Sequence, residues 1–333
     1  MTTAPWIDRQ LEDLLAQPHH ALLLQGPSGL GQYELALGLA RAWLCESPSA
    51  HGACGHCASC HAIDVRTHAD LCFLMPETAM LELGWPLSEK AQKDIDDKTR
   101  KPSKEIRVDA MRDAVEFSQR TSGRGRGKVV VVYPAERMNH ITANTLLKTL
   151  EEPVGDVRFI LATEASHQLL PTIRSRCMAR TLAWPAEPQA LAWLLAQDVP
   201  ADDAPVLLRA AGGRPEDALR RARAGVSARQ WSLLPKAVAR GDVSAIAAFT
   251  PAEAVDALQK VCHDLLAVRA GGQPRFFMPA DLPPGAPEGQ LAAWWRELAA
   301  TMRSVEHPFN AGLLQESLVT RARQALHSGR NAS

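Results

Sequence analysis

The sequence predicts an α/β domain with a parallel sheet, followed by a region that is helical throughout. Up to about residue 184, short apolar runs of strand length alternate with helical patterns, which is typical of a parallel sheet covered by helices. From there to the end, Ala/Leu-rich helical patterns dominate and no convincing strand remains. A third observation is the Gly-rich turn at residues 26–31, which separates an apolar strand from a helix, as in a phosphate-binding loop.

The elements of the α/β domain follow from the spacing of the apolar residues. Uninterrupted apolar runs predict buried strands, at residues 21–24, 70–74, 128–133 and 158–163. Apolar residues that recur every three to four positions predict helices, at residues 7–16, 32–44, 108–120 and 142–150. Residues 77–103 are polar, charged and weakly patterned, so a flexible loop or insertion is predicted there.

The bulk properties exclude several classes of protein. The chain has 333 residues, enough for two or three domains at roughly 100–150 residues each. Its 37 basic and 37 acidic residues balance, so no strong overall field attracts nucleic acid or membrane. The N-terminus lacks the pattern of a signal peptide, and no apolar run reaches the roughly 18 residues of a membrane span. We therefore expect a cytoplasmic protein without a membrane partner.

Four of the seven cysteines form a cluster with the spacing C-x8-C-x2-C-x2-C, at Cys45, Cys54, Cys57 and Cys60. In a chain without a leader, such a cluster indicates metal rather than disulfides, and thiolates at two-residue spacing suit tetrahedral zinc. Four sulfurs leave no coordination position for water, so a structural site is predicted. Interleaved histidines could replace one cysteine; they are His51, His56 and His61. The alternative is a set of unligated thiols in a loop.

The phosphate-binding loop departs from the active pattern. A working loop continues with Lys and Ser/Thr, but this chain has Gln32 and Tyr33. The acidic pair that handles magnesium and water should follow the strand at 128–133, and those positions hold Tyr133 and Pro134, with Glu136 the nearest acid. We therefore expect neither ATP binding nor hydrolysis at the degenerate loop, whose residues are Gly26, Gly29, Gly31, Gln32 and Tyr33. The alternative is a Gly-rich turn of an unrelated α/β domain.

The segment 170–177 places Arg174 and Arg176 on either side of Ser175. These arginines could be ordinary surface charge. The sharper hypothesis is an arginine finger that reaches the nucleotide site of a neighbouring subunit and stabilises charge in the transition state.

Five stretches, taken together, point to one family. They are His19–Leu23, the four-cysteine module, Asn144–Pro153, Phe159–Thr163 and Ser175–Cys177. The Leu-Leu-Lys-x-Leu-Glu-Glu-Pro and Ser-Arg-Cys signatures among them are highly specific. The chain resembles the clamp-loader subunits of bacterial DNA polymerase III, which are members of the AAA+ superfamily. The similarity is dense from Pro5 to about Cys177 and faint beyond Trp184.

The resemblance assigns roles to individual residues. Arg176 matches the finger that acts in trans on an adjacent ATPase subunit, and Thr163 lies at the end of the sensor-1 strand. The four cysteines match the family's zinc module. In the sensor-2 pattern at residues 213–217, Glu216 stands where an arginine is expected, although Arg214 lies close by. The positions that depart from the active pattern all depart in one direction, toward a non-hydrolysing subunit; they are Gln32, Tyr33, Tyr133, Pro134 and Glu216.

The resemblance also implies a domain organisation and partners. Three domains are expected: an AAA+ core with the degenerate loop and zinc module (1–184), a helical lid (185–225) and a C-terminal helical collar (226–333). The chain would be no enzyme by itself, but a non-catalytic subunit of a DNA-directed DNA polymerase, a nucleotidyltransferase. Its partners would be gamma/tau-type ATPase subunits and a delta subunit in a hetero-oligomer. Through that complex it would serve the sliding clamp and primed DNA.

Two other functions remain open from the residues alone. One is a divergent, active AAA+ ATPase that uses Glu136 and backbone amides. The other is a stand-alone, zinc-dependent nucleic-acid-binding protein. The basic turn around Arg124, Arg126 and Lys128 could touch DNA phosphates, but a solvated loop tip is favoured because no matching basic stripe exists. Trp294 and Trp295 are interpreted as packing residues rather than a base-stacking platform.

Overall fold

The computed structural model describes residues 4–17, 19–284, 286–305, 307 and 310–327. The chain divides into two compact units, residues 1–185 and 186–333, and each is described by itself. The first unit ends at Pro185, one residue beyond the domain limit predicted at 184. The outermost predicted limits, residues 1 and 333, lie outside the described residues. The predicted division of the second unit at residue 225 stays a prediction.

The first unit is built on a parallel sheet of five strands in the order β2-β3-β4-β1-β5. The strands are β1 (Ala21–Gln25), β2 (Leu71–Leu74), β3 (Lys128–Val132), β4 (Val157–Thr163) and β5 (Met178–Thr181). β1 lies between β4 and β5, and its Leu23 pairs with Leu161 on one side and with Ala179 on the other. Such central strands are buried on both faces, which is why they read as continuous apolar runs. The predicted parallel α/β fold is confirmed.

β5 was not predicted from the sequence. Three of its four residues are exposed, because it forms the edge of the sheet next to β1. An edge strand of this length has no run of apolar residues that would mark it in the sequence. It carries the chain back to the sheet directly after Cys177.

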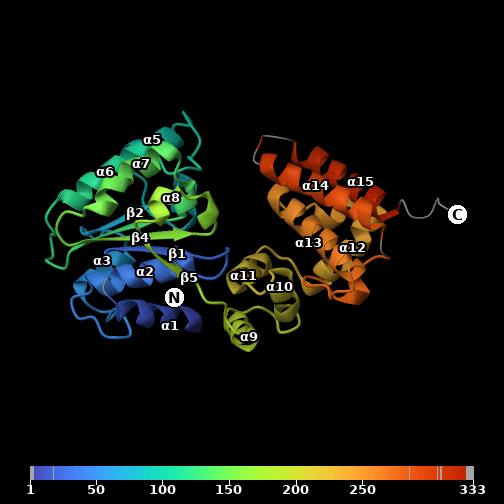
Figure 1. The fold of residues 1–333 in the computed structure, drawn as a ribbon, viewed down its shortest axis with the longest axis horizontal. Coiled ribbons are helices and arrows are strands. Elements are labelled where there is room, and N and C mark those ends of the chain that lie inside the picture. Colours follow the sequence, from blue (N-terminus) through green and yellow to red (C-terminus); the bar gives the residue numbers. More distant parts are fainter. Residues whose placement is uncertain (1–3, 18, 285, 306, 308–309, 328–333) are drawn as a thin grey trace. The chain divides into compact units, whose positions relative to one another are not determined.

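Helices cover both faces of this sheet, with α2 on one face and α6 and α7 on the other (Figure 1). The helices of the first unit are α1 (Pro5–Leu15), α2 (Gln32–Leu44), α3 (Ala58–Asp64), α4 (Glu77–Glu82), α5 (Glu89–Asp96), α6 (Val108–Gln119), α7 (His140–Glu151) and α8 (Pro171–Arg174). Asn139 begins α7 by accepting a hydrogen bond from the backbone N–H of Thr142, at 2.9 Å. The helix stops before Pro153, as predicted.

Of the two predictions for residues 77–103, the flexible loop is wrong, whereas the insertion stays a prediction. The segment contains α4 and α5 and is closed by an ion pair in which Arg100 donates to both carboxylate oxygens of Glu77, at 2.5 and 2.8 Å. The backbone N–H of Ser103 adds a third hydrogen bond to Glu77, at 2.8 Å. Trp85, between the two helices, is buried. The segment is ordered mainly by charge pairing and one aromatic residue, and a search for apolar periodicity detects neither.

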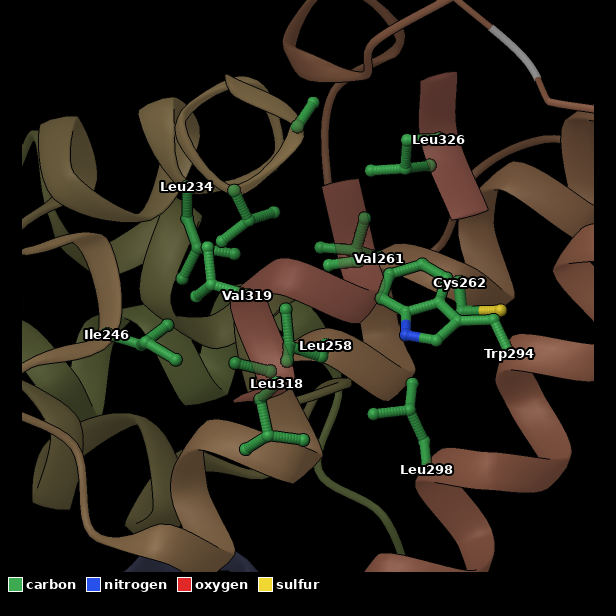
Figure 2. Close-up of a cluster of buried hydrophobic side chains, with 14 of the residues drawn as sticks. Leu234, Ile246, Leu258, Val261, Cys262, Trp294, Leu298, Leu318, Val319 and Leu326 are labelled. Carbon is green, nitrogen blue, oxygen red and sulfur yellow. The ribbon is translucent and has the colours of Figure 1, made fainter. Parts of the chain in front are cut away.

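The described part of the second unit has helices as its long elements. They are α9 (Glu187–Ala196), α10 (Ala204–Ala210), α11 (Pro215–Arg223), α12 (Ala228–Arg240), α13 (Pro251–Arg269), α14 (Glu288–Ser304) and α15 (Ala311–His327). One buried cluster joins α9, α10 and α11, and a larger one joins α12 to α15. Figure 2 shows the larger cluster, in which Trp294 of α14 lies beside Cys262 of α13.

Trp294 therefore packs in the core as predicted, whereas Trp295 is 38% exposed and does not belong to it. In the part of the chain that the structure describes, no helix has both the length and the apolar character needed to cross a membrane.

Candidate functional site

The candidate nucleotide site lies where the parallel strands end. Because parallel strands place their carboxyl ends at the same edge of a sheet, the residues that follow β1, β3 and β4 gather there. After β1 the chain forms the glycine turn (residues 26–31) and enters α2. Gly29 and Gly31 adopt positive φ angles of 76° and 94°, a conformation that glycine takes without strain. The predicted strand, turn and helix are all present.

Gln32, the first residue of α2, fills the turn with its own side chain. Its Nε2 donates hydrogen bonds to the carbonyl oxygens of Gly26 and Pro27, at 2.9 and 2.6 Å, and the residue is only 2% exposed. A lysine at this position would offer a cation to a polyphosphate. The amide of Gln32 instead ties the two ends of the turn together and adds no charge.

The next residue, Tyr33, belongs to an aromatic cluster with Phe73, Trp85 and Tyr133. Its ring centroid lies 5.8 Å from that of Phe73 and 5.6 Å from that of Tyr133. Trp85, from the segment between α4 and α5, donates its indole N–H to the Tyr33 hydroxyl at 2.8 Å. Burial raises the pKa of Tyr33, so the hydroxyl stays neutral. This position therefore lacks the short side chain of Ser or Thr, whose hydroxyl normally binds magnesium. The hydroxyl of Tyr33 supplies no anionic oxygen in its place.

Tyr133 takes the position that follows β3, where an acid would handle magnesium and water. Its hydroxyl donates to Glu164 at 3.2 Å. Glu136, the nearest acid along the chain, accepts a hydrogen bond from the hydroxyl of Thr163 at 2.6 Å and others from the backbone N–H of Glu164 at 3.2 and 3.3 Å. Glu136 thus links the end of β3 to the end of β4, and Thr163 at the predicted sensor position is its partner.

The sensor-2 residues belong to the second unit and are described only within it. Arg214 precedes α11 and donates from Nε to Asp217 at 2.6 Å. Glu216 lies in the first turn of the same helix. Arg214 is therefore paired with an acid of the helix that it precedes.

The four clustered cysteines converge, as their spacing predicts. Their sulfur atoms all lie within 4.8 Å of one another, with Cys45 and Cys57 at 3.8 Å and Cys54 and Cys60 at 4.0 Å. Sulfurs bound to zinc at about 2.3 Å in a tetrahedron would lie about 3.8 Å apart. The donor set fits a metal ion of this kind, and these four residues can hold one.

Backbone N–H groups support the sulfurs. The N–H of Cys54 donates to the sulfur of Cys45 at 3.3 Å, and that of Cys60 donates to the sulfur of Cys57 at 3.4 Å. Burial opposes ionisation of Cys57, but hydrogen bonds from the backbone of Cys60 and Glu46 outweigh it and lower the pKa of Cys57 to about 6. Burial raises the pKa of Cys60 to about 12, so this thiol needs the charge of a bound metal to ionise.

The interleaved histidines lie outside this sulfur cluster in the described residues. His51 contacts Glu12 through Nδ1 at 2.6 Å, and His56 contacts the carbonyl oxygen of Cys54 at 2.9 Å. The sulfur cluster thus offers four possible metal ligands without a histidine.

The finger candidate, Arg176, lies two residues beyond α8. Its side chain is 29% exposed and donates from Nε to Oε1 of Glu151 at 2.6 Å and from Nη1 to the carbonyl oxygen of Thr172 at 2.8 Å. Nη2 also donates to Glu151. Arg174 is exposed. Two residues around these sites received no role from the sequence. Trp85 lies in no motif, and Glu151 lies inside the Leu-Leu-Lys-x-Leu-Glu-Glu-Pro signature, which identifies the family without assigning a task to that residue.

The three basic residues of the turn at residues 124–128 are not all available to bind phosphate. Lys128 is buried, with its Nζ 3.4 Å from Asp70 and 4.0 Å from the centroid of the Phe117 ring. Arg124 pairs with Glu46 at 3.2 Å. The preference for a loop tip over a DNA-binding stripe agrees with these contacts.

A family model described as DNA polymerase III, delta subunit, matches residues 8–185, more than half of the chain. The chain belongs to this family. The matched range agrees with the prediction that the resemblance is dense in the α/β part and faint beyond it. Together with the parallel sheet and the glycine turn, family membership confirms the predicted AAA+ core.

Individual relatives carry related names. A DNA polymerase III subunit delta' of Pseudomonas aeruginosa is 40% identical over 207 residues, which cover 62% of this chain and 56% of the relative. Subunit delta' of Escherichia coli is 36% identical over 221 residues, covering 65% and 59%. Subunit tau of Escherichia coli is 32% identical over 164 residues, covering 49% and 22%. The matches to the two delta' subunits thus span less than two thirds of those relatives.

Proposed function

We propose that this chain is a delta-prime-type, non-hydrolysing subunit of a DNA polymerase III clamp loader, which helps to load the sliding clamp onto primed DNA. The observation that carries the proposal is the way its glycine turn is filled. Gln32 occupies the turn, and Tyr33 and Tyr133 stand in contact where magnesium ligands are expected. The names of its relatives support the same assignment.

Phosphoryl transfer needs a cation on the phosphates, a bound magnesium ion and an oriented nucleophile. In this chain Gln32 stands in place of the cation, and the aromatic cluster stands in place of the magnesium ligands. Glu136 could orient the nucleophile, but it accepts a hydrogen bond from Thr163. The chain would therefore be no ATPase by itself, but a non-catalytic part of the polymerase assembly. Without a nucleotide to bind and release, it would keep one shape while its neighbours cycle.

Arg176 would act on a neighbour's ATP rather than on one of its own. A guanidinium group is always charged and matches phosphate geometry with two parallel hydrogen bonds. The neighbour would be a gamma/tau-type ATPase subunit, with a delta subunit, the clamp and primed DNA as further members or targets of the complex. The predicted arrangement of core, lid (185–225) and collar (226–333) is part of this proposal, and the two separate helical clusters of the second unit support it. The four cysteines would hold a structural zinc ion.

The first test concerns the purified chain. We expect no magnesium-dependent binding of ATP in calorimetry and no release of phosphate, with a gamma/tau-type subunit as positive control. Micromolar affinity together with turnover would overturn the proposal in favour of a divergent active ATPase. Salt-sensitive binding of DNA by the isolated chain would instead favour the zinc-dependent nucleic-acid-binding protein.

The second test concerns the reconstituted complex. Arg176→Ala should lower the ATP hydrolysis that clamp and primed DNA stimulate, by roughly 10³-fold at the affected site. Because other sites of the complex keep their own arginines, total hydrolysis falls less. Arg174→Ala is the matched control, since Arg174 is exposed two residues away and should leave the rate unchanged. Equal rates for Arg176→Ala and the unaltered complex would refute the finger.

A further inference from the structure

The contact between Glu151 and Arg176 joins two elements that are far apart in the chain. Glu151 is the last residue of α7, and Arg176 follows α8. A single oxygen, Oε1 of Glu151, accepts from both Nε and Nη2 of Arg176, with the Nε contact at 2.6 Å. The carbonyl oxygen of Thr172 accepts from Nη1 at 2.8 Å, and the hydroxyl oxygen of Ser175 accepts from the same nitrogen at 3.4 Å. Every nitrogen of the guanidinium group therefore has a partner in its own chain.

Glu151 contacts one side of the guanidinium group, and Thr172 and Ser175 contact its Nη1. Its five N–H bonds lie in a plane and form two edges, each able to grip an anion with two parallel hydrogen bonds. Glu151 occupies the edge made by Nε and Nη2. Each of Nη1 and Nη2 carries a second hydrogen, and these two hydrogens form the remaining edge. Of the two contacts of Nη1, the one to Ser175 is long at 3.4 Å, so an oxygen of a phosphate group can replace it at this edge.

Glu151 and Arg176 each lie next to a buried residue in the chain. Leu150, next to Glu151, is fully buried in the core of the first unit. On the other side, the backbone N–H of Arg176 donates to the carbonyl oxygen of Ile173 at 3.1 Å, and Ile173 and Cys177 are both buried in that same core. The ion pair thus connects two anchored segments, so it can fix the direction of a long and otherwise adaptable side chain.

We propose that Glu151 is the positioning residue for Arg176. The inference rests on the proposed function, in which Arg176 reaches the ATP of a neighbouring subunit. Glu151 holds the Nε–Nη2 edge and thereby presents the Nη1–Nη2 edge to the transferring phosphate. It touches neither the nucleotide nor the reacting atoms. A positioned arginine has already lost the rotamer freedom that it would otherwise lose in the transition state.

The test uses the reconstituted complex with clamp and primed DNA. Glu151→Ala should lower stimulated ATP hydrolysis toward the level of Arg176→Ala, by up to about 10²-fold at the affected site, since small misplacements of a catalytic group cost rate steeply. The fall should appear in kcat, with KM for ATP unchanged. Glu151→Gln retains an acceptor oxygen and should keep more activity than Glu151→Ala. Glu152→Ala is the matched control, because Glu152 is also exposed and does not pair with Arg176 in the described residues.

A double variant separates positioning from a merely structural role. Glu151→Ala combined with Arg176→Ala should be no slower than Arg176→Ala alone, because Glu151 acts only through that arginine. A further loss would overturn the inference. So would a rate for Glu151→Ala equal to or above that of the unaltered complex, which would mean that Glu151 is idle or restrains the finger. Should Arg176→Ala itself have no effect, the finger of the proposed function fails, and the inference fails with it.

Discussion

The rings of Tyr33 and Tyr133 lie against each other, with 5.6 Å between their centroids and 43° between their planes. Tyr33 is the second residue of α2, which starts directly after the glycine turn, and Tyr133 directly follows β3. In the sequence these are two separate departures from the pattern of an active ATPase. In the fold they are one feature, because each ring packs on the other. The residues at the two positions where magnesium ligands are expected therefore form one packed aromatic pair.

Restoring the glycine turn alone should not restore hydrolysis. In a variant with Gln32→Lys and Tyr33→Thr, Tyr133 still stands where a carboxylate is needed, so magnesium lacks that ligand. We expect no magnesium-dependent phosphate release by this variant in a steady-state assay with ATP. The unaltered chain is the negative control. Turnover by the double variant would show that Tyr133 does not block the site.

Removing the amide of Gln32 should loosen the turn. Gln32→Ala leaves the carbonyl oxygens of Gly26 and Pro27 without their buried donor, which costs about 1–3 kcal/mol. Hydrogen exchange of the amides in β1 and α2 should become faster by the corresponding factor. Gln17→Ala is the control, because Gln17 is exposed. Unchanged exchange in the Gln32 variant would mean that the turn holds its shape without the side chain.

The zinc prediction can be checked by metal content. Cys57→Ser should remove about one equivalent of zinc, as measured by mass spectrometry of the metal, and should lower the melting temperature. Cys72→Ser is the control, since Cys72 lies in β2 outside the sulfur cluster and burial raises the pKa of its thiol to about 12. Equal zinc content in the Cys57 and Cys72 variants would contradict the assignment.

Lys260 should destabilise the second unit at neutral pH. Burial lowers its pKa from 10.5 to about 8, although Asp256 lies 2.6 Å away. Because the folded pKa is below the unfolded one, the penalty is complete below pH 8 and is relieved as the pH rises from about 8 to 10.5. Lys260→Met leaves Asp256 its second partner, Arg221, at 2.8 Å.

For that variant we expect a free energy of unfolding at pH 7 that is higher by roughly 1 kcal/mol, and a flatter pH dependence above pH 8. Urea unfolding at pH 7 and pH 9.5 measures both. Lys236→Met, at an exposed position, should retain the pH dependence of the unaltered chain. A marked loss of stability in Lys260→Met would show that the ion pair outweighs the burial of its charge.

Much of the fold follows from local patterns. The buried strands β1, β3 and β4 are continuous apolar runs, and the start of α2 is fixed by the glycine turn before it. β5 escaped prediction because an exposed edge strand lacks such a run. The helices α4 and α5 escaped it because Arg100 and Glu77, which close their segment, are 23 positions apart and oppositely charged rather than apolar.

The candidate sites, like the fold, were predictable from the sequence only in part. The cysteine spacing was enough to predict the sulfur cluster, since two-residue spacers bring neighbouring sulfurs together. Gln32 and Tyr33 were recognisable in the sequence as departures from a motif. The contacts that their side chains make in the fold were not. That Gln32 would bond to the turn itself, and that Trp85 would reach the hydroxyl of Tyr33, depends on tertiary contacts between segments that carry no shared pattern.

The side chain of Gln32 belongs to the same chain as the turn that it fills. Its presence in the turn therefore does not depend on the concentration of any molecule in the cell. A phosphate-binding loop that relies on a diffusing nucleotide is filled or empty according to the concentration of that nucleotide in the cell. Under the proposed function, this turn would have no such dependence. Newly made copies of the chain would fold to the same shape in starved and in growing cells, and would be ready for assembly before any nucleotide is available.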